Sequence, residues 1–361
     1  MRESRFHWEP VELKPNSRVA VAMSGGLDST VAAQRLMGQG HEVKAFHMVL
    51  TTDALSVKSA QSAAKLIGLN LEVLDLSSQF EELIVDPFVR SYVSGETPNP
   101  CVSCNFQIKF GLLWERAKIR GADYLATGHY TRLVTVKESE TPVLSRSPDL
   151  KKDQTYFLCR LTPDILSRTI FPLADMTKAQ VKKEAFSLGL SARDESQDAC
   201  FLFGKNYREF LLERLSNHDI VPGDFVDTEG RILGRHRGLI HYTVGQRRAL
   251  GISGPEPYYV LSLDSVNNRV VLGTKKQTFS RAVFVRDLVW SFGPLDTKFT
   301  ARVQIRSRHH PALAQVNLLH GNRAEVIFHE PQQAVTPGQS AAFFDNDILL
   351  GGGWIEKSST E

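Results

Sequence analysis

One short stretch, between residues 19 and 36, constrains this chain more than any other. Residues 19–22 are a run of Val and Ala, which predicts a buried strand. Ser-Gly-Gly-Leu-Asp-Ser follows at residues 24–29, and residues 31–36 continue with the spacing of a helix. A strand, a glycine turn and a helix N-terminus make an anion site, because free N–H groups and the helix dipole point at the ligand.

The side chains of this loop narrow the kind of anion. The glycines let backbone amides approach a phosphate, and Ser24, Ser29 and Thr30 add hydroxyl donors. Asp28 is unusual in a pure anion site, and it fits if it caps the helix or holds Mg²⁺ against the phosphates. The loop is neither a Walker loop nor a Gly-x-Gly-x-x-Gly dinucleotide fingerprint. A nucleotide is the favoured ligand, and a plain glycine turn with a helix cap is the alternative.

Length and composition limit the classes of protein to which this chain can belong. The 361 residues predict two or three domains, and 42% hydrophobic with 23% charged residues is ordinary for a globular protein. The net charge of +3 permits a nucleic-acid partner without arguing for one. No apolar run approaches the ~20 residues of a membrane span, and residues 1–17 lack the apolar core of a secretory signal. Four cysteines are too few for a disulfide scaffold. We therefore expect a cytoplasmic protein with no membrane association.

The first part of the chain alternates strand and helix signals. Strands are expected at 19–22, 43–50, 71–76 and 121–128, and helices at 56–67, 106–120, 163–169, 177–188 and 207–215. This alternation predicts an α/β, doubly wound parallel sheet. Ligands of such sheets bind at the carboxyl ends of the strands, where residues 24–29 would lie.

From about residue 222 the pattern changes to short β-rich runs separated by turns. It predicts a small β-rich central domain and then a C-terminal β-barrel. The expected domains are 1–216, 217–275 and 276–361.

Two cysteines follow an Asn-Pro pair. Residues 98–100 predict a non-helical loop ahead of the 106–120 helix, so that Cys104 would lie near the helix N-terminus. The helix dipole would then lower the pKa of the thiol and favour the thiolate. Cys101 and Cys104 could equally form half a metal site or a redox pair, and two buried small residues in a turn are the plainer alternative. Cys200 is unremarkable by itself, and Cys159 is expected to be structural because its segment is apolar.

Several other polar segments are candidates for ligand or RNA contacts. His129 follows a predicted strand end at the ligand edge, and a hydrogen-bonded structural histidine is the alternative. Residues 151–156 carry charge in a loop that could simply be solvated. Arg302, Arg306 and Arg308 would share one face of a regular strand, which suits phosphate contacts, although a solvated edge strand is also consistent.

Together these motifs resemble the tRNA-specific 2-thiouridylase family of PP-loop ATP pyrophosphatases, from residue 19 to residue 355. Several ordered motifs are more specific than any single one. The motifs are AMSGGLDS at 22–29, TPNP at 97–100, CN at 104–105, IKF at 108–110, ATGHY at 126–130, KDQ at 152–154, ESQD at 195–198 with Cys200, YTVGQR at 242–247 and TPGQS at 336–340.

The resemblance implies an adenine nucleotide alpha hydrolase-like fold and conversion of the tRNA wobble uridine (Lys, Glu and Gln type anticodons) to 2-thiouridine. The uridine C2 oxygen would attack the α-phosphate of ATP, with Mg²⁺, to give an adenylated base and pyrophosphate. Cys200 would receive persulfide sulfur from a sulfur-carrier protein or cysteine desulfurase. Cys104 would be the nucleophile that releases this sulfur, as sulfide or with formation of a Cys104–Cys200 disulfide. The implied ATP-binding residues are Ala22, Met23, Ser24, Gly25, Gly26, Leu27, Asp28, Ser29, Met48 and Gly128.

The resemblance also implies that a flipped base reaches the site. We also expect the enzyme to be a monomer. Position 101 is often Asp in the family, where it is proposed to aid proton transfer, and Ser307 stands where a bulkier aromatic residue is common. Cys101 could still act as acid or base. With Cys104 and Cys200 it could instead hold a four-iron four-sulfur cluster that binds sulfide. The implied contacts with the target base and tRNA are Asn99, Pro100, Cys101, His129, Lys152, Asp153, Gln154, Arg306, Ser307 and Gln339.

Two other classes of function compete with this one. A PP-loop amidating ligase for a small metabolite would release pyrophosphate without RNA, but no N-terminal glutaminase cysteine is visible to supply ammonia. A non-catalytic RNA-binding protein would have a degenerate nucleotide loop, whereas residues 24–29 are intact.

Overall fold

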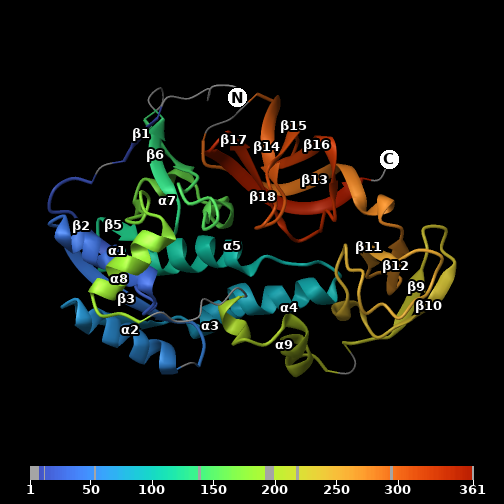
Figure 1. Cartoon of the computed structure of the whole chain (residues 1–361), viewed down its shortest axis with the longest axis horizontal. Coiled ribbons are helices and arrows are strands. Elements are labelled where there is room, and N and C mark those ends of the chain that lie inside the picture. The colour runs from blue at the N-terminus through green and yellow to red at the C-terminus, as the bar shows by residue number, and fades with distance from the viewer. Residues whose placement is uncertain are drawn as a thin grey trace.

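A five-stranded parallel sheet carries the nucleotide loop at the left of Figure 1. The computed structural model describes residues 8–11, 13–52, 54–136, 140–191, 199–216, 219–292 and 296–359. Val19, Ala20 and Val21 of the central strand are buried, which is why this apolar run forms a strand covered on both faces. The predicted doubly wound sheet is therefore confirmed. The sheet order is β4 (Leu71–Asp75), β3 (Glu42–Val49), β2 (Arg18–Ala22), β5 (Tyr124–Ala126) and β8 (Thr169–Ile170).

Three helices pack around this sheet: α1 (Leu27–Gly38), α2 (Ala54–Leu66) and α8 (Lys178–Ser187). Figure 1 shows α1 and α8 side by side, with α2 below the sheet. Helix α8 begins where the Thr177 hydroxyl accepts from the backbone N–H of Gln180, whose side chain bonds back to Thr177. Shorter helices are α7 (Pro163–Leu166), α9 (Tyr207–Arg214), η3 (Thr155–Leu158), η4 (Cys200–Leu202), η5 (Leu239–His241) and η6 (Lys276–Thr278).

Two longer helices run from the sheet across the middle of the molecule (Figure 1). Each contains a stretch of π-helix, in which hydrogen bonds span five residues instead of four. The first consists of α3 (Ser77–Phe80), η1 (Glu81–Val85) and α4 (Asp86–Val93). The second consists of α5 (Pro100–Cys104), η2 (Asn105–Leu113) and α6 (Trp114–Ile119).

The strands after residue 222 form a small sheet at the right of Figure 1 and a closed barrel at the upper right. Both units confirm the β-rich architecture expected beyond residue 222. The small sheet is ordered β10 (Ile232–His236), β9 (Gly223–Val226), β12 (Arg269–Gly273) and β11 (Tyr259–Asp264). The barrel strands are β13 (Phe279–Trp290), β14 (Lys298–Gln304), β15 (Ala312–Leu319), β16 (Arg323–Gln333), β17 (Ser340–Asp345) and β18 (Ile348–Ser359), and β17 closes the barrel on both β14 and β18.

A hairpin from the α/β part joins this barrel. Strands β1 (Trp8–Pro10), β6 (Arg132–Val136) and β7 (Thr141–Ser145) pair in that order, and Ser145 of β7 pairs with Ile348 of β18. One hydrophobic core also crosses the junction, since Leu144 and Tyr156 pack in the same cluster as barrel residues such as Phe344. The proposed domain limits stay a prediction, and the break at residue 217 falls outside the described residues.

The basic strand face expected at residues 302–308 does not form. Strand β14 ends at Gln304, and Arg306 lies in a turn closed by a hydrogen bond from His309 N to Arg306 O at 3.0 Å. Arg302 is therefore on the strand, whereas Arg306 and Arg308 are in the turn after it. Within the described residues, no helix is both long and apolar enough to span a bilayer.

Candidate active site

The nucleotide loop connects β2 to α1 and is held by its own hydroxyl groups. Ser24 Oγ lies 3.2 Å from Ser29 Oγ and accepts from Gly26 N at 3.3 Å. Gly25 has φ +79°, and a Cβ there would lie 2.6 Å from Ala60 N of helix α2. Only glycine fits this position, because the conformation is left-handed and the neighbouring backbone is too close for a side chain. The loop thereby presents backbone N–H groups at the positive end of α1.

Asp28 does not cap this helix, which corrects one of the two roles expected for it. The N-cap is Gly26, which has no side chain, and Asp28 lies in the first turn. Its carboxylate oxygens are both 2.8 Å from Nζ of Lys178, and Oδ1 also accepts from the Tyr130 hydroxyl at 2.6 Å. The Lys178 side chain is only 10% exposed and that of Asp28 is 33% exposed, so water is excluded mainly from the lysine side of this ion pair.

The other residues implied for ATP lie at the same sheet edge. Met48 is near the end of β3, and Gly128 follows β5, so both flank the loop after β2. A Cβ on Gly128 would lie 2.9 Å from Asp28 C and Ser29 N, so glycine is needed where this segment crosses the first turn of α1. His47 Nδ1 lies 2.8 Å from Met23 O and fixes the loop from β3.

The helix that carries Cys104 begins earlier than expected. Pro100 occupies its first turn, with Asn99 at the N-cap, so Cys101 lies in the first turn and Cys104 in the second. The prediction of a non-helical loop through Pro100 was wrong because proline is well tolerated at the first helical position, where its missing N–H costs nothing. The expected dipole effect on Cys104 was wrong as well. Burial raises the pKa of its thiol to about 12.

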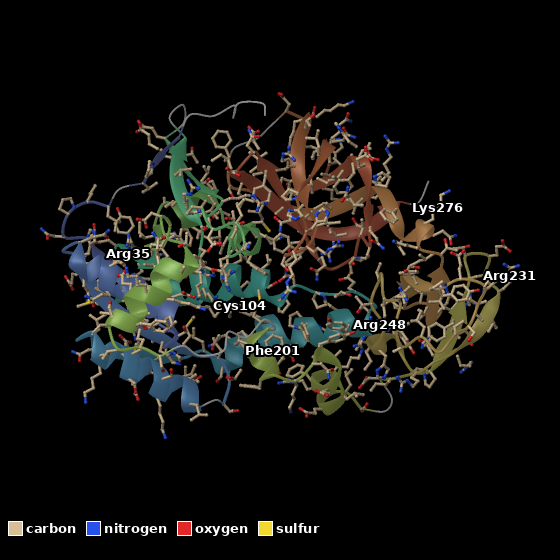
Figure 2. The ribbon with its side chains drawn as sticks, viewed as in Figure 1. Arg35, Cys104, Phe201, Arg231, Arg248 and Lys276 are labelled. Atoms are coloured by element: carbon tan, nitrogen blue, oxygen red, sulfur yellow. The ribbon has the colours of Figure 1, made fainter. Side chains whose placement is uncertain are left out.

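Three thiols and one lysine share this region. Burial raises the pKa of Cys101, Cys104 and Cys200, and the positive charge of Lys109 opposes this rise in each. Cys101 and Cys200 reach solvent, whereas Cys104 is buried. Figure 2 shows Cys104 on the central helix, above the segment that carries Phe201. None of the cysteines is in a disulfide.

Lys109 is a site residue whose role sequence reasoning missed, although the IKF motif contains it. It lies in η2, five residues after Cys104. In an α-helix such positions point about 140° apart, whereas the five-residue hydrogen bond of a π-helix brings them close to one line. The π-helical stretch therefore turns Lys109 toward the side of the thiols.

His129 is buried, at 8% exposure, with Nδ1 2.7 Å from the Thr127 hydroxyl. Its ring lies near Phe110 and Phe171, with centroids 6.1 and 6.3 Å away. Burial and then the charge of Lys109 hold the pKa of His129 well below its usual range. The structure thus gives it the surroundings of a neutral, hydrogen-bonded histidine.

Two of the residues implied for the target base, Asn99 and Pro100, border a cavity of about 150 Å³ between α4, α5 and the barrel, whereas Cys101 is not part of its lining. Asn99, Pro100 and Ser103 line it, with Arg286 and Trp354 from the barrel. The amide of Gln339 donates to the carbonyl oxygens of Thr97 and Pro98 at 2.9 and 3.3 Å. The side chain of Gln339 therefore holds the chain just before Cys101.

The two segments implied for tRNA contact are joined through the interior. Asp153 binds Arg146 at 2.9 Å, and the Asp153 side chain is only 4% exposed. Arg146 donates to Gln304 Oε1 at 2.8 Å, and the Gln304 amide donates to the carbonyl oxygens of Arg306 and Ser307 at 3.1 and 3.0 Å. Arg146 and Gln304 were not predicted, because 158 positions separate them in the chain.

The described residues contain no group of three or more His, Cys, Asp or Glu side chains placed to hold a metal ion. The three cysteines, as they stand, do not form a cluster site. Residues 195–198, which precede Cys200 in the motif, lie outside the described residues.

Models of three protein families match successive parts of the chain. The family described as tRNA methyl transferase HUP domain matches residues 17–204, a PRC-barrel domain of the same name matches 208–274, and an aminomethyltransferase beta-barrel domain matches 280–355.

Curated relatives named tRNA-specific 2-thiouridylase MnmA match almost end to end. Those of Geobacter metallireducens, Pelobacter propionicus and Syntrophotalea carbinolica are 40%, 42% and 42% identical. The alignments cover 96%, 94% and 94% of this chain and 99%, 97% and 99% of the relatives. The chain therefore belongs to the tRNA-specific 2-thiouridylase family.

Proposed function

We propose that this protein catalyses ATP-dependent 2-thiolation of the wobble uridine of tRNA. The observation that carries the proposal is that a glycine-rich anion loop and two cysteines 96 positions apart, Cys104 and Cys200, belong to one α/β unit, with the thiols close enough to influence each other's charge. The proposal assigns ATP-dependent activation to the loop and sulfur transfer to the two cysteines of the same α/β unit.

In the first step the uridine C2 oxygen attacks the α-phosphate of ATP and pyrophosphate leaves. Backbone N–H groups of residues 24–29 receive the phosphates, because the loop and the helix dipole both favour negative charge there. Mg²⁺ is held mainly by the ATP phosphates, since the carboxylate of Asp28 is already engaged by Lys178.

In the second step sulfur replaces the activated oxygen. Cys200 carries the terminal sulfur of a persulfide, which attacks C2 while AMP leaves with the C2 oxygen. Cys104, as thiolate, attacks the inner sulfur of Cys200, so the electron pair of the S–S bond goes to the sulfur that joins the base. The products are 2-thiouridine and a Cys104–Cys200 disulfide, which an external thiol must reduce. The alternative is delivery of sulfide on a four-iron four-sulfur cluster held by Cys101, Cys104 and Cys200, and these thiols would have to move together to hold it.

The tRNA contacts are proposed in two groups. Lys152 and Arg306 offer cations to the phosphates, while Asn99, Pro100 and Cys101 border the target base. His129, Asp153 and Gln339 act mainly by holding their segments, because their polar groups are engaged inside the protein. Gln154 and Ser307 complete the set, and the persulfide donor is a sulfur-carrier protein or a cysteine desulfurase. The enzyme acts as a monomer in the cytoplasm.

The test is formation of 2-thiouridine from transcribed tRNA, ATP, Mg²⁺ and a persulfide donor, measured by mass spectrometry of nucleosides. Cys200→Ser should abolish the product, whereas Cys159→Ala, which removes a buried thiol of the core, should keep it in the folded fraction. Full activity of Cys200→Ser would contradict the sulfur-transfer role. Pyrophosphate release that survives complete removal of RNA would favour an amidating ligase instead.

A further inference from the structure

Asp28 in the nucleotide loop is held by two donors from distant parts of the chain. The hydroxyl of Tyr130, after β5, donates at 2.6 Å, and the ammonium of Lys178, at the start of α8, lies 2.8 Å from each oxygen. Both donors offset the negative charge that Asp28 brings to a phosphate-binding loop. A freed Asp28 carboxylate would repel ATP, so ATP affinity depends on how firmly these donors are placed.

One loop, residues 147–154, holds both donors. Its last residue, Gln154, accepts from Tyr130 N through Oε1 and donates its own N–H to Tyr130 O, each at 2.9 Å. Near its start, Asp149 Oδ2 accepts from the backbone N–H of Lys178 at 3.1 Å. The two ends of the loop therefore position the two groups that bind Asp28.

The same loop is braced from within and from the barrel. Asp153 accepts from Ser147 N at 2.9 Å and from the Thr155 hydroxyl at 2.6 Å. Arg146, bound to Asp153, continues to Gln304 of β14 and so to the turn at Arg306. The residues proposed to contact tRNA, at 152–154 and 306–307, thus connect through hydrogen bonds to Asp28.

We propose that the 147–154 loop couples tRNA docking to the nucleotide loop, with Tyr130, Lys178 and Asp149 as positioning residues. This inference rests on the proposed function, because it takes tRNA as the ligand that binds to the loop. Docked RNA restrains the loop, which keeps Tyr130 and Lys178 on Asp28 and raises the affinity for ATP. Linkage then requires ATP to raise the affinity for tRNA by the same factor. The protein therefore binds ATP tightly mainly when the RNA substrate is present.

The test measures the affinity of the full-length protein for an ATP analogue that cannot be cleaved between the α- and β-phosphates, with and without saturating tRNA. Binding of tRNA is measured separately by filter retention. The wild-type protein should bind the analogue at least about fivefold more tightly with tRNA, the lower range of typical coupling. Asp149→Ala, which removes the acceptor of the Lys178 backbone N–H, should reduce this factor toward one while tRNA is still bound. Tyr130→Phe removes only the hydroxyl that donates to Asp28. This variant should also reduce the coupling factor toward one, and it should bind the analogue less tightly in the absence of tRNA.

The matched control is Asp175→Ala. Asp175 also binds α1, through two hydrogen bonds of 3.0 Å from Arg35, but it holds neither Tyr130 nor Lys178. It should leave the coupling factor unchanged. Wild-type protein that binds tRNA and the analogue independently, or an Asp149→Ala protein with undiminished coupling, overturns the coupling alone. Failure of tRNA to bind at all overturns the proposed function together with it.

Discussion

The side-chain amide of Gln339 donates a hydrogen bond of 2.9 Å to the carbonyl oxygen of Thr97. The barrel thereby holds the chain that leads to Cys101, and a second contact reinforces it, from Thr97 N to Pro337 O at 2.9 Å. A Cβ on Gly338 would lie 3.1 Å from Thr97 N, so the two backbones meet directly. The loop before the cysteine helix is therefore set by a residue 242 positions away.

Gln339→Leu should test whether this residue acts through the loop or through RNA. Loss of both hydrogen bonds should destabilise the observed conformation of the loop by about 1–2 kcal/mol. As a result, kcat for thiolation should fall about tenfold. The affinity for tRNA, measured by filter binding, should change less than about twofold. Gln315→Leu, in barrel strand β15, is the control. A large loss of tRNA affinity with unchanged kcat would instead indicate direct contact.

Lys109→Met should slow alkylation of the site cysteines. A neighbouring positive charge lowers a thiol pKa, so its removal raises the pKa of Cys101, Cys104 and Cys200 further and reduces the thiolate fraction at a given pH. Iodoacetamide labelling, followed site by site with mass spectrometry between pH 7 and 10, should slow by about threefold to tenfold. Lys109→Arg should retain most of the rate. Lys118→Met, on the same long helix, should behave as wild type, and equal rates in Lys109→Met would refute the role.

Gly128→Ala should impair the nucleotide loop. The added Cβ would lie 2.9 Å from backbone atoms of Asp28 and Ser29, so the first turn of α1 must shift. ATP affinity should drop about tenfold or more, with a loss of about 1–3 kcal/mol in the free energy of unfolding. Gly38→Ala is a matched control at the other end of α1, because a Cβ there meets nothing within 4 Å. Nucleotide binding and urea unfolding of both variants provide the measurement.

Acid should destabilise the fold through His129. The pKa of His129 is held well below 6.5 by burial, so the unfolded chain binds more protons than the folded one once the pH falls below 6.5. Stability from this group is therefore present at neutral pH and declines below 6.5, by up to about 1.4 kcal/mol per pH unit. His129→Asn should flatten the difference in urea unfolding between pH 7.5 and 5. His320→Asn, at an exposed position, should not, and an unchanged slope in His129→Asn would contradict the prediction.

Local patterns were sufficient for the parallel sheet and the nucleotide loop. The apolar run before Ser24 and the glycines after it each have a local physical consequence, and both predictions were confirmed by the buried β2 and the left-handed Gly25. The start of the cysteine helix was misjudged, because proline at the first helical position and proline in a loop look alike in one sequence. The π-helical stretch that turns Lys109 also has no simple periodic signal.

Polar contacts between residues far apart in the chain could not be predicted from the sequence. Asp28 and Lys178 are 150 positions apart, and neither residue shows in the sequence which partner will neutralise it. The burial that raises the pKa of Cys104 likewise comes from tertiary packing and outweighs the helix dipole on which the prediction relied. The roles assigned to the site residues through family resemblance stay predictions until variants are assayed.

The pairing of β7 with β18 has a consequence for biosynthesis. Strand β1 and the β6–β7 hairpin, all from the first 145 residues, pair with the barrel through Ile348 of its last strand. A chain growing on the ribosome can form the parallel sheet early, but it cannot close this seam until residues beyond 348 have been made. In nascent chains, the nucleotide loop should therefore fold well before the surface proposed to bind tRNA is complete.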